Sequence, residues 1–142
     1  MEEIDTSKTE KIIKQNLSSV RKEFDELKAK HFILLQRVSR TNYEPDKSTL
    51  ASIKLLLDEI VDLIKSQNDY ISTLKSGKLD VHKDALAVIQ LYNQSLKNLL
   101  LNWQVQLKEL KYSAPVHEFE EKTVASLKLL IKDCKKAIRS ID

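Results

Sequence analysis

Apolar residues recur along this chain at alternating steps of three and four, the spacing that places side chains on one face of an α-helix. Four segments carry the pattern, at about residues 7–40, 48–76, 81–111 and 115–140. Each segment is therefore predicted to form a long amphipathic helix. The first segment has these residues on its apolar face: Ile13, Leu17, Val20, Phe24, Leu27, Leu34 and Val38.

Three short segments interrupt the pattern, at residues 42–47, 76–80 and 112–115. Pro45 removes a backbone donor and disfavours helix in the residue before it. Gly77 can take the left-handed conformation that closes a helix, and Asp80 can cap the next one. Ser113 can cap the last helix, with Pro115 in its first turn. All four helices are therefore predicted to be joined by tight connections.

Short connections make consecutive helices antiparallel neighbours, and we expect them to be of matched length. The sequence thus predicts an all-α fold, an up-down-up-down antiparallel four-helix bundle of long helices, with residues 1–142 as a single domain. A chain of this length can bury a substantial core without metals or disulfides. The single glycine excludes strand-rich folds with frequent turns and glycine-rich phosphate loops.

Charge and cysteine content suggest the class of partner and the compartment. The 24 basic and 21 acidic residues give a net charge of +3, too small a surplus to indicate nucleic-acid binding by itself. Cys134 is the only cysteine, so no intramolecular disulfide can form, and we expect a cytoplasmic or nuclear protein. The acidic N-terminal residues do not resemble a secretory signal, and no apolar run is long enough to span a bilayer.

The sequence contains no recognisable arrangement of catalytic or metal-binding residues. A zinc site needs several His, Cys or carboxylate ligands around one ion, but the predicted bundle puts His82 and His117 at opposite ends. The carboxylates of the second helix are expected on its polar, solvated side: Asp58, Glu59 and Asp62. We therefore expect no catalytic residues, no cofactor and no metal, and a protein that is not an enzyme.

Three residues stand out because they occupy apolar faces. His31 lies between Leu27 and Leu34, and we interpret it as a partly buried histidine bonded to a neighbouring helix. A pH-sensing or register-setting role is the alternative, and the same two interpretations apply to Gln67. Cys134 is interpreted as an unreactive core residue.

The third helix is the main candidate for a partner surface. Between residues 85 and 107 its only charged side chain is Lys97. A helical projection centred on Leu96 places apolar and amide residues on the outward side, a composition typical of interface centres. Scattered exposed leucines are the alternative explanation. We predict partner binding at Leu91, Gln94, Asn98, Leu101, Asn102 and Val105.

The fourth helix carries a basic stripe, defined as Lys128, Lys132, Lys135, Lys136 and Arg139. This stripe could bind an anionic surface, or it could simply match the negative end of the helix dipole. The favoured function is a non-enzymatic adaptor or assembly subunit that binds another protein, or its own copy, through the third helix. The alternative is an electrostatic module for nucleic acid or a peripheral anionic membrane that uses the basic stripe; we do not expect nucleic acid to be a main partner.

Overall fold

The computed structural model of this chain is a four-helix bundle, and it describes residues 2–39 and 43–141, with side chains from residue 7 onward. The helices are α1 (Glu2–Val38), α2 (Lys47–Ser76), α3 (Asp80–Ser113) and α4 (Glu121–Ile141). The predicted fold class is therefore confirmed, and the bounds of the middle two helices agree within two residues. The helix end predicted at residue 40 and the break at Asn42 lie partly outside the described residues.

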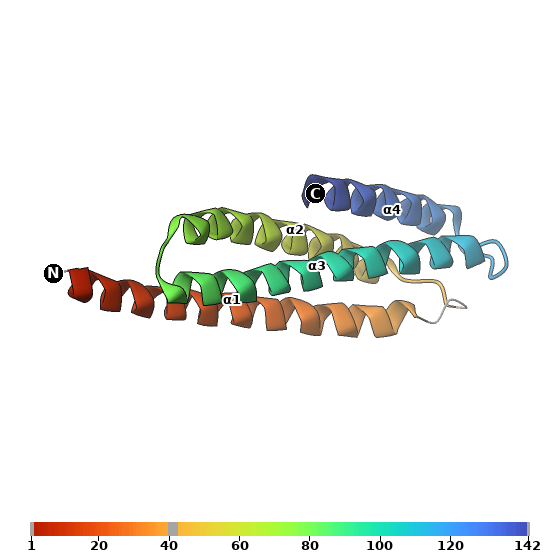
Figure 1. Cartoon of the computed structure of the whole chain (residues 1–142). Helices are drawn as coiled ribbons and strands as arrows, with labels where there is room; N and C mark the ends of the chain where they lie inside the picture. Colours follow the sequence, from red (N-terminus) through yellow and green to blue (C-terminus); the bar gives the residue numbers. More distant parts are fainter. Residues whose placement is uncertain (1, 40–42, 142) are drawn as a thin grey trace.

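Contacts between helices fix their directions. Asn16 of α1 donates to the Tyr70 hydroxyl of α2 at 3.4 Å, whereas Lys30, further along α1, pairs with Glu59, which is earlier in α2. These two helices are therefore antiparallel. The contacts between α1 and α3 follow the same order along both helices: the Phe24 ring stacks on Tyr92, and the Val38 carbonyl accepts from Gln106. These two helices are therefore parallel. Figure 1 shows the chain reversing direction at each connection.

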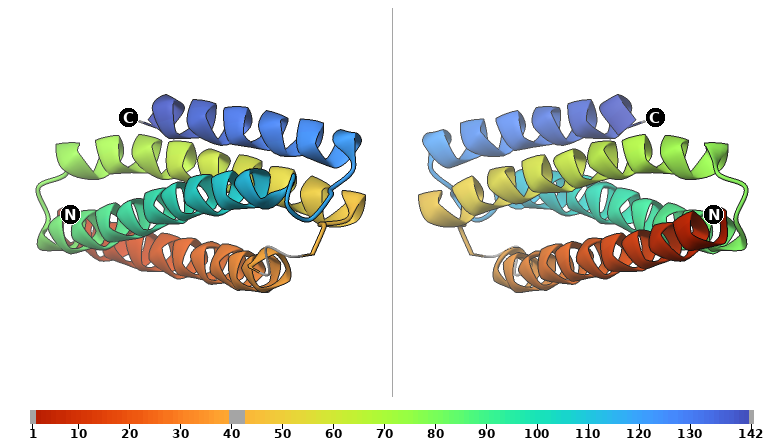
Figure 2. Two further views of the ribbon diagram at one scale, coloured as in Figure 1. Left: turned by 90° about the vertical axis from the view of Figure 1, so that its right-hand side faces the viewer. Right: turned by 90° about the vertical axis from the view of Figure 1, so that its left-hand side faces the viewer.

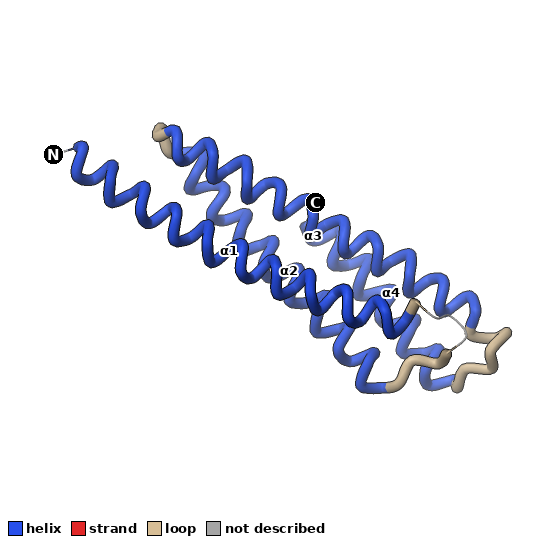
Figure 3. Tube along the Cα trace, turned by 90° about the horizontal axis from the view of Figure 1, so that it is seen from below, coloured by secondary structure: helices blue, strands red, loops and turns tan. Residues whose placement is uncertain are grey.

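The four helices do not surround one core equally. Every pair of helices packs closely except α1 and α4, whose backbones do not approach each other closely in the described part of the chain. Figure 2 shows α4 on one side of the α2–α3 pair and α1 on the other. The expectation of matched lengths is wrong: α1 has 37 residues and α4 has 21, about 56 Å against 32 Å. The α4 helix consequently ends partway along the bundle (Figures 1 and 3).

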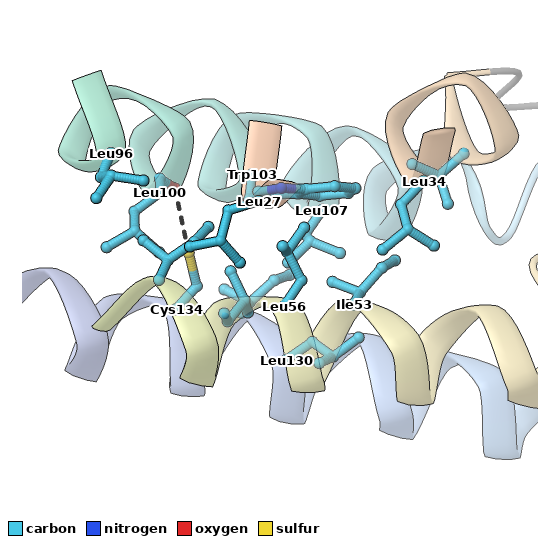
Figure 4. Close-up of a cluster of buried hydrophobic side chains, with 14 of the residues drawn as sticks. Leu27, Leu34, Ile53, Leu56, Leu96, Leu100, Trp103, Leu107, Leu130 and Cys134 are labelled. Carbon is cyan, nitrogen blue, oxygen red and sulfur yellow. Dashed lines mark hydrogen bonds between the residues drawn. The ribbon is translucent and has the colours of Figure 1, made fainter. Parts of the chain in front are cut away.

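The apolar interior divides into two clusters at the level where α4 ends. We call the first the four-helix half; its buried side chains come from all four helices and include Leu27, Ile60, Leu100, Trp103 and Leu127. Figure 4 shows part of this cluster, with side chains of α3 meeting those of α2 and α4. We call the second the three-helix half; its buried side chains come from α1, α2 and α3 and are Ile13, Leu74, Ala85 and Ile89.

The surface of α2 and α3 next to the end of α4 is polar. Lys54 of α2 pairs with Asp133 of α4 at 3.5 Å, so this side of α2 faces α4. Asn68 comes fourteen residues later, close to four full turns, and therefore lies on the same side. There it accepts a hydrogen bond from Asn93 of α3 at 2.9 Å. A hydrogen-bonded amide pair therefore joins α2 and α3 on this side of the bundle.

The start of α4 corrects the predicted boundary at residue 115. The Ser113 hydroxyl donates back to the Leu110 carbonyl at 2.9 Å, so it closes α3 rather than capping α4. The chain then turns, with Glu118 in the left-handed region at a φ of 53°. The Glu44 carboxylate accepts from the Glu120 backbone N–H immediately before the helix. The first turn of α4 is therefore fixed by a side chain from the distant α1–α2 connection.

The turn between α2 and α3 also differs from the expectation. Gly77 is extended, with φ −80° and ψ 150°, rather than left-handed. A Cβ at this position would clash with the His82 ring, so glycine is needed for close approach. Leu79 is the N-cap of α3, without a side-chain cap bond, and Asp80 is the first helical residue. Its negative charge still suits the positive end of the helix dipole.

Candidate protein-docking surfaces

The outward side of α3 is the surface that the sequence singled out, and the structure exposes every residue of it. Leu91, Leu101 and Val105 are 64%, 40% and 57% exposed. On the opposite side of the same helix, Leu96 and Trp103 are fully buried. The predicted polar members are also exposed: Gln94, Asn98 and Asn102. We call these six residues the α3 outer face.

The α3 outer face is apolar and amide-rich over several turns. Gln94 donates to the Asn98 side chain at 3.2 Å, so the amides partly satisfy one another. Val88, which the sequence analysis did not include, adds a further exposed apolar side chain near the start of this surface. Lys97, the single cation of the stretch, is only half-exposed. The face therefore presents leucine, valine and neutral amides with little charge.

The basic stripe of α4 is fully on the surface. All five of its side chains are exposed, and among the described residues none forms an ion pair within the chain.

Cys134 and Gln67, which the sequence places on apolar faces, are both buried in the bundle. The Cys134 thiol is fully buried and donates to the Leu100 carbonyl at 3.3 Å (Figure 4). Burial raises the pKa of this thiol to about 11, which keeps it protonated and unreactive at neutral pH. Gln67 is 2% exposed, and neither its amide nitrogen nor its oxygen has a partner among the described residues. It lies just before Asn68, at the boundary between the two halves.

His31 is more deeply buried than expected, at 2% exposure, and its Nδ1 has no hydrogen-bond partner among the described residues. The imidazole instead packs edge-on against Trp103 of α3, with ring centroids 5.5 Å apart, and against Phe32 at 5.6 Å. Burial lowers the pKa of His31 below its ordinary value. The packing therefore favours the neutral imidazole.

A groove between α1 and α2 was missed by the sequence analysis. Its apolar part, about 260 Å³, includes Ile33 and Leu55, which are 54% and 60% exposed. Its acidic part, about 330 Å³, is lined by Glu23, Glu26, Glu59 and Asp62. The sequence signal for this groove was weak, because its residues come from two helices and each isolated leucine or carboxylate is ordinary on a surface.

A cavity of about 680 Å³ lies between the N-terminal parts of α2 and α4. Most of its charged groups already form bonds within the fold. Asp46 caps α2 by accepting from the Thr49 N–H at 2.7 Å, Glu44 holds the start of α4, and Asp133 pairs with Lys54. These bonds stabilise the starts of α2 and α4 and the contact between the two helices. The carboxylates that line the cavity therefore have structural roles.

The described part of the chain contains no group of three His, Cys, Asp or Glu side chains arranged to hold an ion. Nor does any helix in that part have the length and apolarity needed to cross a bilayer.

Comparison with known proteins gives no match to a family model, to a curated protein or to a solved structure.

Proposed function

We propose that this chain is a non-enzymatic protein-binding module, an adaptor or assembly subunit that docks a partner protein or a second copy through the α3 outer face. The exposed apolar side chains of Leu91, Leu101 and Val105, flanked by neutral amides, support this proposal. Monomeric soluble proteins rarely expose extended apolar surface without a binding role. Interface centres also lose charged residues while they retain amides and apolar groups.

A double variant that introduces charges on the α3 outer face tests this proposal. The double variant Leu101→Glu with Val105→Lys places opposite charges on adjacent turns of the α3 outer face. Both residues are exposed, so we expect the free energy of unfolding to change by no more than about 0.5 kcal/mol each. Buried interface anchors can cost about 2 kcal/mol or more, so association should weaken at least about thirtyfold. Sedimentation velocity measures self-association, and affinity capture followed by mass spectrometry measures partner binding.

A matched control uses the same substitutions on α4. Ala125→Glu with Leu129→Lys has the same four-residue spacing at exposed positions, and Leu129 is 62% exposed. This control should retain every association that the parent chain shows. Equal binding by the parent, the control and the α3 variant would identify Leu101 and Val105 as ordinary surface residues. Unfolding of the α3 variant would show instead that this side of α3 belongs to the core.

The alternative function is an electrostatic module that binds an anionic membrane or nucleic acid through the basic stripe. It is supported by the five exposed cations of the stripe, none of which forms an ion pair with another described residue. Vesicles containing phosphatidylserine, and duplex DNA, are the direct probes. Under our favoured proposal, the triple variant Lys128→Glu, Lys132→Glu and Lys136→Glu changes retention little at physiological salt. Tight binding by the parent chain that falls steeply with salt and disappears in this variant would favour the alternative.

A further inference from the structure

The groove between α1 and α2 has an apolar part that nothing in the described chain covers. Ile33 of α1 and Leu55 of α2 stand on either side of it, each more than half exposed. Leu34 and Leu56 form its lining and belong to the buried core. An apolar side chain entering here would therefore meet exposed groups at the rim and the core at the base. Such a surface is the usual setting for a helix-in-groove contact.

The acidic part of the groove adjoins the apolar part. Lys30 and Glu59 line both parts, and their side chains form an ion pair at 3.0 Å where the two meet. Beyond this pair lie Glu23, Glu26 and Asp62, and none of these three has an ion pair among the described residues. Three unpaired carboxylates thus gather in a chain whose net charge is +3.

We propose that this groove docks a basic amphipathic helix of a partner protein. The apolar part takes the partner's leucine-like side chains, and the carboxylates take its lysine or arginine side chains. Charge complementarity selects this occupant: the carboxylates repel phosphate groups, so nucleic acid and anionic lipid do not fit here. Two packed helices also present the ridges and grooves that receive a third helix.

The groove sets the spacing that the partner must have. Leu55 and Asp62 are seven residues apart on α2, which is about 10.5 Å along the helix. A helix lying along the groove therefore needs an apolar residue and a basic residue separated by about two turns. In the antiparallel pair Glu26 lies at about the level of Asp62, and a further basic residue one turn beyond would reach Glu23. This pattern is specific enough to be recognised in selected sequences.

The groove does not depend on the α3 outer face. Lys30 and Ile33 face α2, whereas Phe24 and His31 of the same helix contact α3. Two partners could therefore bind at the same time, one at the groove and one at the α3 outer face. The inference consequently goes beyond the proposed function, and the failure of either leaves the other unaffected.

Selection from a displayed library of 18-residue helical peptides, using the full chain as target, tests the proposal. The library varies apolar, basic and acidic residues at exposed positions, and each selected peptide is measured by fluorescence anisotropy. We expect peptides that carry lysine or arginine about seven residues from an apolar residue. Leu55→Glu should weaken their binding at least tenfold, and so should the double variant Glu26→Lys with Asp62→Lys.

Matched controls separate the groove from general stickiness. Leu129→Glu changes a leucine of similar exposure on α4 and should leave peptide binding within twofold. The Leu101→Glu with Val105→Lys variant should also bind normally, which separates this test from that of the proposed function. Circular dichroism checks that each variant folds, and Leu55→Ser replaces Leu55→Glu if the latter does not. Selection of acidic or uncharged peptides, equal loss in the Leu129→Glu variant, or no peptide sensitive to Leu55 would overturn the proposal.

Discussion

The four-helix half and the three-helix half are built from the same α1, α2 and α3, yet they differ in how much they bury. The four-helix half holds twenty buried apolar side chains, whereas the three-helix half holds four. Because α4 ends between them, α2 and α3 lose one neighbour and expose polar side chains instead. Local stability follows the density of buried contacts. We therefore expect the three-helix half to open first, and four predictions test this comparison.

The largest effects on the free energy of unfolding should come from truncating one buried side chain in each cluster. Leu100→Ala removes a fully buried side chain that packs near α4, and we expect the free energy of unfolding to fall by about 2–5 kcal/mol. Ile89→Ala removes a fully buried side chain of the three-helix half. We expect it to lower the free energy of unfolding by about 2 kcal/mol. Urea unfolding measures both values. Ile33→Ala is an exposed control and should have little effect.

Hydrogen exchange then locates each loss. Ile89→Ala should speed exchange mainly in the parts of α2 and α3 that form the three-helix half. Leu100→Ala should speed it throughout the chain, because global unfolding becomes easier. If Ile89→Ala accelerates exchange in α4 as strongly as Leu100→Ala does, the two clusters form one cooperative unit and the comparison is wrong.

Gln67→Leu tests the boundary between the halves and should stabilise the chain. A buried amide without partners costs about 1–3 kcal/mol, which a leucine of similar volume would recover. The gain would appear as a higher midpoint of urea unfolding. Gln90→Leu, at an exposed position of α3, serves as the control and should change the midpoint little. A loss of stability in Gln67→Leu would indicate that the amide binds an ordered water molecule.

Gly77→Ala tests the turn that closes the three-helix half. The added Cβ would clash with the His82 ring, and we expect a loss of about 1 kcal/mol. His82→Ala in the same chain should restore most of this loss, since the clashing ring is then absent. Thermal unfolding of the two single variants and the double variant measures the coupling. Additive effects would contradict the close approach described here.

The smallest expected effect is a pH dependence that originates in the four-helix half. Burial lowers the pKa of His31 in the folded chain, so the unfolded chain binds its proton more readily. The free energy of unfolding therefore has its full value above the ordinary histidine pKa, about 6.5. It falls as the pH decreases through that value. His31→Leu should flatten this part of the stability curve.

Periodicity predicted the helices, and helical projection predicted the exposure of Leu101 and Val105, because both depend on residues close in sequence. The start of α4 could not be predicted in this way, because Glu44 holds it from the α1–α2 connection. The need for glycine at residue 77 comes from the His82 ring, and helical periodicity does not indicate where the turn places that ring. The α1–α2 groove was equally hidden, since Ile33 and Leu55 meet only in three dimensions.

The bond between Glu44 and the Glu120 N–H also bears on the order in which the chain folds. It joins residues 76 positions apart, whereas the hydrogen bond between Asn68 and Asn93 spans only 25. Contacts that close short loops form fast, and helical bundles rich in them fold in microseconds to milliseconds. The hairpins α1–α2 and α2–α3 can therefore assemble before α4 acquires its first turn. During synthesis α4 emerges after the other three helices, so α1, α2 and α3 can form the surface onto which it docks.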